Sequence, residues 1–348
     1  MREMLAETVE KILANICQPA LVRSVEVGQW PAEFWQQLQE TGLPLALAPE
    51  SVGGVAVGWH DALPILLGCG RYAVPVPLAE TVAAHGLATC AGVELPEGIL
   101  TLADFGHDQG GAGALTLTAQ NVPFASVADW VVGSLEHREG GESFAELIVL
   151  RKADAAQSES ARLGGEGRAD LYWCEVTPVL RARLPAGMSA RVVGAAIRSA
   201  QLAGAIGRVL ELSVVYADER KQFGKTLSKF QALQQQLAVL GQYSVSAAMA
   251  AELAGDSADA CLDPQRVGYA KALVSEVAHK AAMIAHALHG AIGTTAEYDL
   301  QLLTRRIWAW RLDFGSEAYW NLFGGQALIG SGEAVWSRVV ELSNRAPG

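Results

Sequence analysis

The sequence predicts an α+β fold that is mainly α-helical, with an N-terminal helical domain, a small middle β domain and a C-terminal four-helix bundle. Three observations carry this prediction. Of the 348 residues, 51% are hydrophobic and 18% are charged, which is ample apolar material for two or three folded units. Short β-rich runs fill the middle of the chain, and four long helical segments follow them. We place the domains at residues 1–94, 95–184 and 185–348.

The first domain alternates amphipathic helices with residues that end them. Leu5, Val9 and Ile16 recur at helical spacing and form one apolar face. Pro19 ends that helix, and a second helix reaches Gly42, where a C-terminal cap is expected. A Gly/Pro-rich loop and two short helices complete the domain.

The middle domain reads as short strands separated by polar turns. The strand candidates are GILTLADF, GALTLTAQ, ADWVVGSL, AELIVLR and DLYWCEVTPVL. The polar loop Arg151–Gly167 and the brevity of the strands favour a small sheet or barrel. Gly110, Gly111 and Gly113 lack the strand and helix order of a dinucleotide fingerprint, so they are interpreted as turn glycines.

The last domain consists of long helices, and the sequence carries signals for where some of them begin. We expect them at Ser189–Glu219, Ser228–Gly255, Pro264–His289 and Ala296–Leu312. Asp263 and Pro264 predict an N-cap followed by proline at the first helical position. Thr294 and Glu297 predict a capping box before the fourth helix. Alanine and glycine on the helix faces allow close packing, which favours an antiparallel bundle.

Charge and cysteine content exclude several classes of protein. The net charge of −11 repels phosphate backbones and anionic headgroups, so neither nucleic acid nor a membrane surface is an expected partner. We see no apolar run of membrane-spanning length and no signal peptide, and we expect a cytoplasmic protein. Five scattered cysteines without CxxC spacing indicate a reducing compartment, with neither a disulfide framework nor a zinc site. His279, His286 and His289 share one predicted helix without further ligands, so no metal site is expected.

The most informative string is YADERKQFGKTLSKFQALQQQLA, from Tyr216 to Ala238. It predicts a helix end with Arg220 and Lys221, a break at Phe223 and Gly224, and a second helix. In one interpretation the two cations cap the helix through its dipole. The spacing, however, resembles the R-x-Q-F-G-x(5)-F-Q-A signature of the acyl-CoA dehydrogenase family. The matching residues are Arg220, Gln222, Phe223, Gly224, Phe230, Gln231 and Ala232.

A second string, HALHGAIGTTAEYDLQLLTRR, is similar to the same family's phosphate turn between the last two bundle helices. The family resemblance implies an acyl-CoA dehydrogenase-like fold and an FAD cofactor, whose pyrophosphate meets this turn from a neighbouring subunit. Glycines permit such close backbone approach to phosphate. The implied cofactor-binding residues are Arg220, Gln222, Phe223, Gly224, Gln231, His289, Gly290, Ala291 and Gly293. The turn departs from the family at Ala287, which replaces a glutamine, and at Ala291, which replaces a glycine.

The catalytic base is missing from both places where the family carries it. The family removes a proton beside an acyl-CoA thioester with a carboxylate while a hydride passes to the flavin. Gap-free counting places the common position on Phe314 and the alternative position near Gly194, and neither is acidic. Asp313 and Glu317 are the nearest candidates. The family's flavin-contacting T-E-P-x-A-G-S-D loop has only TLADFG, Thr101–Gly106, as a remnant.

Three functional readings follow from this pattern. In the first, the chain is a complete acyl-CoA dehydrogenase with a displaced base, acting on an acyl-CoA and passing electrons to an electron-transfer flavoprotein. In the second, it resembles the smaller subunit of bacterial heteromeric acyl-CoA dehydrogenases, which completes FAD binding while a partner supplies the base. Both imply a homo- or hetero-oligomer. In the third, it is a non-enzymatic helical assembly module, and the Arg220–Gly224 match is accidental.

Overall fold

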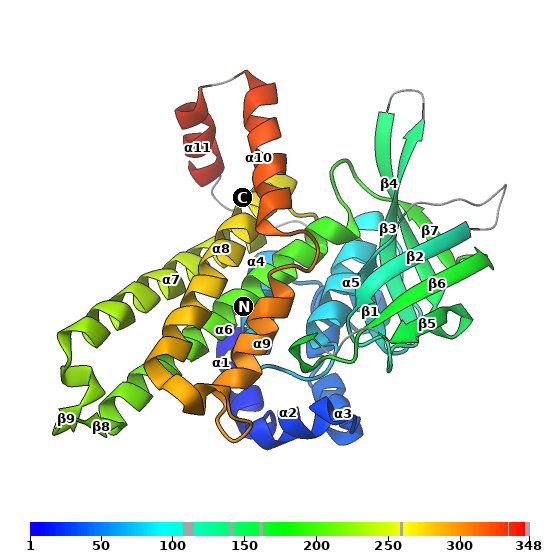
Figure 1. Ribbon diagram of the computed structural model, residues 1–348. Helices are drawn as coiled ribbons and strands as arrows, with labels where there is room; N and C mark the ends of the chain where they lie inside the picture. The colour runs from blue at the N-terminus through cyan, green and yellow to red at the C-terminus, as the bar shows by residue number, and fades with distance from the viewer. Residues whose placement is uncertain (107–114, 140–141, 160–162, 258–259, 333, 345–348) are drawn as a thin grey trace.

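The computed structural model describes residues 1–106, 115–139, 142–159, 163–257, 260–332 and 334–344. Within these residues the predicted order of a helical domain, a β domain and a helical bundle is confirmed (Figure 1). The boundaries proposed at 94/95 and 184/185 fall in the connections before the first strand and before the first long bundle helix. Gly110, Gly111 and Gly113 lie outside the described residues.

The N-terminal part contains five α-helices. They are α1 (Arg2–Ile16), α2 (Pro19–Glu26), α3 (Ala32–Glu40), α4 (Trp59–Arg71) and α5 (Leu78–Ala91). Short 3-10 turns η1 (Leu43–Leu45) and η2 (Glu50–Val52) lie between α3 and α4. Pro19 both separates α1 from α2 and starts α2, because proline at the first helical position needs no amide donor. Gly42 adopts φ 74° just after α3, as expected for a helix-ending glycine.

The β domain consists of two small sheets. The described strands are β1 (Leu100–Asp104), β2 (Leu115–Val122), β3 (Trp130–Glu139), β4 (Glu142–Arg151), β5 (Ala156–Glu159), β6 (Ala169–Val176) and β7 (Leu180–Arg183). The order β1-β3-β4-β7 forms one sheet, in which β1 and β3 are parallel, and β2-β6-β5 forms the other. All five predicted runs contain strands, but β5 lies inside the segment predicted as loop. Its polar sequence AQSE carries no strand pattern.

The C-terminal part holds the bundle and two further helices. The helices are α6 (Ala190–Glu219), α7 (Gln231–Gly255), α8 (Pro264–His289), α9 (Leu300–Trp310), α10 (Glu317–Ser331) and α11 (Val335–Asn344). A hairpin of β8 (Lys221–Gln222) and β9 (Lys225–Thr226) and the turn η5 (Leu227–Lys229) join α6 to α7, and η6 (Gly290–Thr294) follows α8. In Figure 1, α10 and α11 project from the body of the bundle.

One helix start is confirmed and one is wrong. The Asp263 carboxylate accepts from the amides of Gln265 and Arg266, so Asp263 is the predicted N-cap of α8. The capping box of Thr294 and Glu297 does not form, because α9 begins only at Leu300. The Thr294 hydroxyl instead donates to the Ala291 carbonyl at 2.8 Å and closes its own turn.

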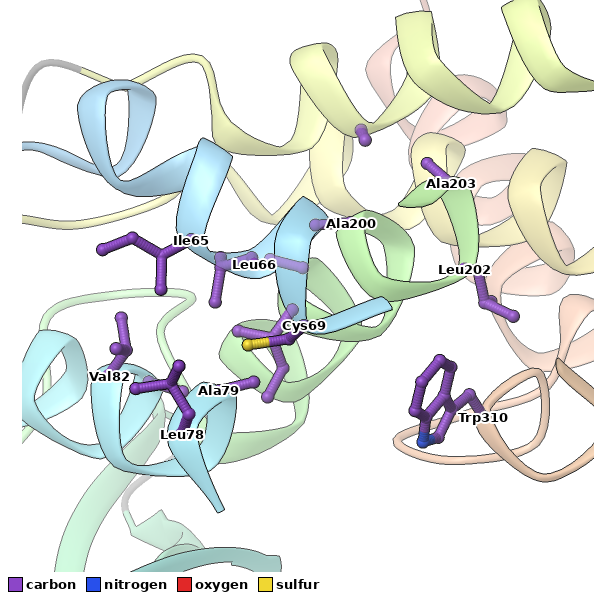
Figure 2. Packing of buried hydrophobic residues seen from close by; sticks show 14 of the residues in the cluster. Ile65, Leu66, Cys69, Leu78, Ala79, Val82, Ala200, Leu202, Ala203 and Trp310 are labelled. Atoms are coloured by element: carbon purple, nitrogen blue, oxygen red, sulfur yellow. The ribbon is translucent and has the colours of Figure 1, made fainter. Parts of the chain in front are cut away.

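A continuous apolar core joins the N-terminal helices to the bundle. Figure 2 shows side chains from α4, α5 and α6 meeting within it. Backbone contact between α4 and α6 makes this junction tight: a Cβ on Gly70 would lie 1.9 Å from the Gln201 carbonyl oxygen, and one on Gly204 would lie 2.0 Å from that of Leu67. Glycine is therefore required at both positions. A second, smaller apolar cluster lies in the β domain.

Helix α7 has unusual composition for a surface helix. By length and composition alone it is the single helix in the described residues that is apolar enough to cross a membrane, with mean hydropathy 1.2 and 28% of that window buried. The helix contains several glutamine and serine side chains, so the expectation of no continuous apolar run of membrane-spanning length is not contradicted. In the structure α7 packs beside α6 and α8 in the bundle.

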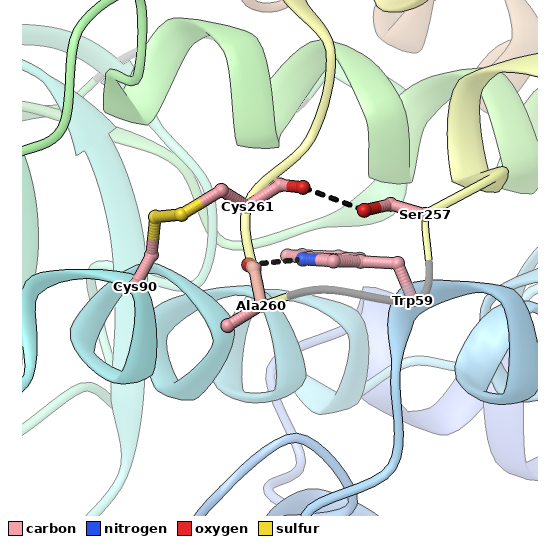
Figure 3. Close-up of a disulfide and its surroundings, with 5 residues drawn as sticks. All are labelled: Trp59, Cys90, Ser257, Ala260 and Cys261. Carbon is pink, nitrogen blue, oxygen red and sulfur yellow. Dashed lines mark hydrogen bonds between the residues drawn. A yellow bond between two sulfur atoms is a disulfide. The ribbon is translucent and has the colours of Figure 1, made fainter. Parts of the chain in front are cut away.

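A disulfide links the N-terminal part to the bundle. Cys90 at the end of α5 bonds to Cys261 in the segment before α8 (Figure 3). Trp59 donates to the Ala260 carbonyl at 2.8 Å and Ser257 donates to the Cys261 carbonyl at 2.7 Å, which fixes this segment against the N-terminal helices. The scattered cysteines gave no indication of a disulfide, because a sequence separation of 171 residues carries no sign of spatial proximity, and this one bond corrects that expectation. Cysteine usage no longer supports a reducing compartment.

Replacing Cys90 with serine is expected to lower the free energy of unfolding by about 2–4 kcal/mol, because the bond closes a long loop in the unfolded chain. Denaturant unfolding of the variant and of the parent, both without a reducing agent, measures the effect. The matched control is Cys174→Ser, which changes an exposed free thiol and is expected to leave stability within about 0.5 kcal/mol. Equal stability of Cys90→Ser and the parent would contradict a stabilising disulfide.

Candidate functional site

The R-x-Q-F-G string forms an exposed hairpin at one end of the bundle. Helix α6 ends at Glu219, and Phe223 (φ 50°) and Gly224 (φ 80°) form a two-residue turn between β8 and β9. Two left-handed residues in succession are the geometry of a type I′ turn, which explains the glycine. The Phe223 side chain is 90% exposed. Its ring lies edge-on to that of Phe230, at 6.3 Å between centroids.

Arg220 lies exposed at the base of this hairpin. Its backbone amide donates to the Tyr216 carbonyl at 2.9 Å. Among the described residues its guanidinium forms no recorded hydrogen bond or ion pair. The side chain therefore forms no hydrogen bond to the carbonyls that end α6, although its charge lies at the negative end of the helix dipole. Gln222 is also exposed, in β8, and Gln231 is the exposed first residue of α7.

The second string forms the turn η6 at the end of α8. His289 is buried and its ring stacks on that of Tyr216 at 4.5 Å between centroids. Its Nδ1 donates to the Ala285 carbonyl at 2.8 Å, and burial lowers its pKa. Gly290 adopts φ 64° and ψ −145°, a conformation that essentially only glycine tolerates.

The two strings meet at the same end of the molecule. Tyr216 lies one turn before Arg220, and its hydroxyl donates to the His289 carbonyl at 3.3 Å. Figure 1 shows the β8–β9 hairpin and the connection from α8 to α9 at the same end of the bundle. Gly290 and Ala291 are exposed on η6, whereas Gly293 is buried against His289 and Leu300. A single surface therefore presents an unpaired guanidinium and an exposed glycine turn.

The two positions where the resemblance places a base lie in direct contact. Phe314 follows α9, and its ring rests on the backbone of Gly194 in α6. A Cβ built on Gly194 would lie 2.2 Å from Cγ of the Phe314 ring. Lys271 and Trp320 hold the turn, donating to the carbonyls of Gly315 and Phe314 at 3.0 Å each. The Phe314 ring therefore leaves no room for a side chain on residue 194.

Asp313 lies in a buried ion-pair network beneath this ring. Its carboxylate accepts from Arg168 at 2.8 and 2.9 Å and from Arg198 at 2.9 Å. Arg168 also pairs with Glu166 at 2.5 Å, and Arg198 pairs with Glu80 at 2.8 Å. Burial alone would raise the pKa of Asp313, but the two guanidinium groups outweigh it and hold that pKa below its usual value.

Glu317 lies at the start of α10 and forms an ion pair with Arg311. Burial would raise its pKa, but its backbone hydrogen bond and the Arg311 guanidinium outweigh this and lower the pKa. Nearby, Lys271 is fully buried, and burial lowers its pKa to about 7. Its amino group donates to the Arg311 carbonyl at 2.8 Å and to Ser275 at 2.9 Å.

A further ion pair links the β domain to the bundle. Arg191 at the start of α6 donates to Asp104 at the end of β1 at 2.6 Å and to the Tyr319 hydroxyl at 2.9 Å. Its guanidinium also lies 4.8 Å from the Tyr319 ring centre. No sequence pattern predicts this bridge, because its residues come from three separate segments. In the remnant loop, Thr101 is buried and donates to the Pro123 carbonyl at 2.6 Å.

The three histidines of α8 do not converge. His279 packs against Trp308 at 6.1 Å between centroids, and His286 lies 2.9 Å from the Thr304 hydroxyl. Within the described segments, no group of three or more His, Cys, Asp or Glu side chains is arranged to hold a metal.

Two family models and a curated relative match this chain. Residues 1–95 match the model of the acyl-CoA dehydrogenase N-terminal domain, and residues 188–321 match that of the C-terminal domain. Acyl-CoA dehydrogenase IpdE2 of Mycobacterium tuberculosis is 30% identical over 319 residues, covering 88% of this chain and 90% of the relative.

Solved structures share the fold at lower identity. The ChsE4-ChsE5 complex from Mycobacterium tuberculosis contains a chain that aligns with TM-score 0.76 and 22% identity, over 96% of this chain and 98% of that one. PigA, solved with FAD and proline, aligns with TM-score 0.77 and 15% identity, over 95% and 98% respectively. At these identities the structures establish the fold alone.

Proposed function

The chain belongs to the acyl-CoA dehydrogenase family, and from that premise we propose that it is the subunit of a heteromeric acyl-CoA dehydrogenase that completes a partner's FAD site and lacks a base of its own. One observation carries the proposal. The ring of Phe314 covers Gly194, so both family positions for the base are filled without a carboxylate. The partner must then supply the group that removes the proton from the acyl-CoA.

The hairpin and η6 fit the diphosphate of FAD. A diphosphate needs a cationic donor on an accessible surface and a backbone that it can approach closely, and the exposed Arg220 guanidinium and the exposed turn at Gly290 and Ala291 lie at the same end of the bundle. The Gly290 amide itself donates to the His286 carbonyl, so the turn would offer close approach and not that N–H group. Bound FAD supplies the acceptor for the hydride that leaves the acyl chain. In this chain Arg220 would hold the diphosphate, while Gln222, Phe223, Gly224, Gln231, His289, Ala291 and Gly293 would shape the surface around it.

The other side of the family site is obstructed in this chain. The Asp104, Arg191 and Tyr319 contacts bridge the β domain and the bundle beside the Phe314 turn. Phe314 itself occupies the space above Gly194. The chain thus presents donors for a neighbour's flavin but blocks the position of its own base, which supports a division of labour between unlike subunits.

The alternative is a complete enzyme whose displaced base is Asp313 or Glu317. Each carboxylate already accepts from arginine, and the lowered pKa of each makes it a weaker base than an ordinary carboxylate. Asp313 is also buried beneath the protein surface. The geometry therefore favours structural roles for both residues.

The relatives are consistent with an unlike partner. ChsE4-ChsE5 is a complex of two differently named chains. For this chain we propose a hetero-oligomer that takes an acyl-CoA substrate in the cytoplasm, with an electron-transfer flavoprotein as the electron acceptor. The homologue to test as partner is one that retains the family's base and is encoded beside this chain.

The test compares the lone chain with the chain co-expressed with such a homologue. Acyl-CoA is added without oxygen, and loss of the flavin's visible absorbance reports reduction. We expect reduction only in the complex, with a loss of at least about 10³-fold when the partner's base carboxylate is changed to its amide, because proton removal then has no base.

Two variants of this chain sharpen the assay. Glu317→Gln in the complex is expected to retain the rate of flavin reduction, because Glu317 pairs with Arg311 rather than serving as the base. Acyl-CoA-dependent bleaching by the lone chain, abolished by Glu317→Gln or by Asp313→Asn in a folded protein, would refute the proposal and support the complete enzyme.

A further inference from the structure

A cavity of about 270 Å³ lies where the N-terminal helices meet the bundle. Its walls come from the end of α1, the start of α2, the end of α4, the middle of α6 and the start of α9. Junctions between folded parts are common places for small-molecule sites, because neither part alone has to fill the space. No residue of the FAD surface or of the Phe314 turn lines this cavity.

The interior of the cavity is apolar. Cys17, Val22, Leu302 and Leu303 line it and are each at most 4% exposed. Burial raises the pKa of the Cys17 thiol to about 12, so this cysteine is a neutral apolar wall and not a nucleophile. Such walls favour an aliphatic body over a charged or strongly hydrated one.

Two arginines stand at the edge of this apolar space. Arg71 and Arg208 both line the cavity, and both donate to the Glu211 carboxylate, at 2.6 and 2.9 Å. Glu10 lies 3.5 Å from Arg71 and is half exposed. Each guanidinium has five N–H donors, so the pair has capacity for a second carboxylate beside Glu211. Glu10 and Glu211 do not themselves line the cavity, and Asp299, the acidic residue that does, pairs with Arg23 at 2.6 Å.

We propose that this cavity is a binding site for a small monocarboxylate with an aliphatic body, whose chain enters between Val22 and Leu303 and whose carboxylate meets Arg71 and Arg208. The combination of buried apolar walls and two guanidinium groups at the edge favours this ligand class over alcohols and amines. The site is independent of the proposed division of labour between subunits.

The site is remote from the acyl position of the family. Gly194 and Arg208 lie on the same helix, so the rise along α6 separates them by about 20 Å. The cavity instead adjoins the FAD surface through short connections. Leu212, on its wall, lies one turn before Tyr216, and Asp299 follows Tyr298; both tyrosine rings contact His289, at 4.5 and 5.2 Å between centroids.

The test uses hexanoate as the probe and hexan-1-ol as its uncharged counterpart, titrated into the purified full-length chain by calorimetry. We expect saturable binding of one hexanoate per chain with Kd on the order of 1 mM, the range for a ligand of this size, and weaker binding of the alcohol. Ala14→Trp, an exposed wall residue at the mouth, is expected to weaken hexanoate binding at least tenfold by blocking entry.

Matched variants separate the site from general effects. Ala20→Trp places the same side chain on an exposed α2 position that does not line the cavity, and is expected to bind like the parent. Arg208→Gln should reduce the preference for hexanoate over hexanol by about tenfold. Absence of saturable binding overturns the proposal, as does equal binding in Ala14→Trp and Ala20→Trp. Thermal unfolding of each variant confirms that it is folded before titration.

Discussion

Replacing Asp313 with asparagine is expected to destabilise the fold by about 3–5 kcal/mol, the usual cost of breaking a buried ion pair. The carboxylate is the shared partner of Arg168 and Arg198, whose side chains are fully buried. Its removal leaves two guanidinium charges with Glu166 and Glu80 as their remaining acidic partners. Denaturant unfolding of the chain or complex measures the change.

The pH dependence of stability follows from the same network. The pKa of Asp313 is lower in the folded chain than in the unfolded chain, so its contribution is complete above the unfolded value of about 4. It is lost as the pH falls through the lower folded pKa. The Asp313→Asn variant should therefore show a smaller loss of stability on acidification than the parent.

Glu317→Gln is the control for this prediction. Its carboxylate is more exposed and pairs only with Arg311 among the ion pairs described, so the expected loss is at most about 1 kcal/mol. If Asp313→Asn kept the parent's stability and lost only catalytic activity, the residue would be acting as a base and not as a structural anchor.

Replacing Arg220 with alanine is expected to weaken flavin binding by the assembled complex about 10- to 100-fold, because charge-assisted hydrogen bonds to phosphate are lost. The guanidinium has no recorded partner among the described residues, so the fold should not change. The ratio of flavin to protein absorbance after gel filtration, and titration of the flavin-free complex with FAD, give the two measurements.

Lys221→Ala removes the same charge from the next residue in the same hairpin. Successive side chains of a strand point to opposite sides, so Lys221 is expected to leave flavin affinity within about threefold of the parent. Arg220→Lys keeps the charge but loses the planar fork, and an intermediate affinity is expected. Unchanged flavin content in Arg220→Ala would favour the interpretation of this segment as a capped helix corner.

Local sequence patterns were sufficient for most of the fold. Some elements depend only on residues that are neighbours in the sequence, so the sequence alone predicts them. Examples are the apolar spacing in α1, the Asp263-Pro264 start of α8 and the strand runs. Strand β5 has no such pattern, since its polar residues pair only because β6 lies alongside. The start of α9 depends on the packing of Leu300 against Gly293, which the Thr294 and Glu297 pattern does not contain.

Part of the candidate site could likewise be predicted from the sequence, and part required the structure. The Arg220 and Gly290 strings were found because the family fixes their spacing, but their contact through Tyr216 and His289 required the structure. The buried network of Asp313 joins four distant segments, and each of its residues alone looks like an ordinary surface charge in the sequence. The disulfide between Cys90 and Cys261 was not predicted for the same reason: its two residues are far apart in the sequence.

The contact between Phe314 and Gly194 limits the order in which substitutions at these two positions can occur. Any side chain gained at residue 194 would collide with the ring, so an acidic substitution there is selected against while Phe314 remains. Residue 314 must change first, and that step alone leaves Gly194 unable to contribute a carboxylate. A carboxylate at residue 194 therefore requires a change at residue 314 as well, whereas a glutamate at residue 314 requires no change at residue 194.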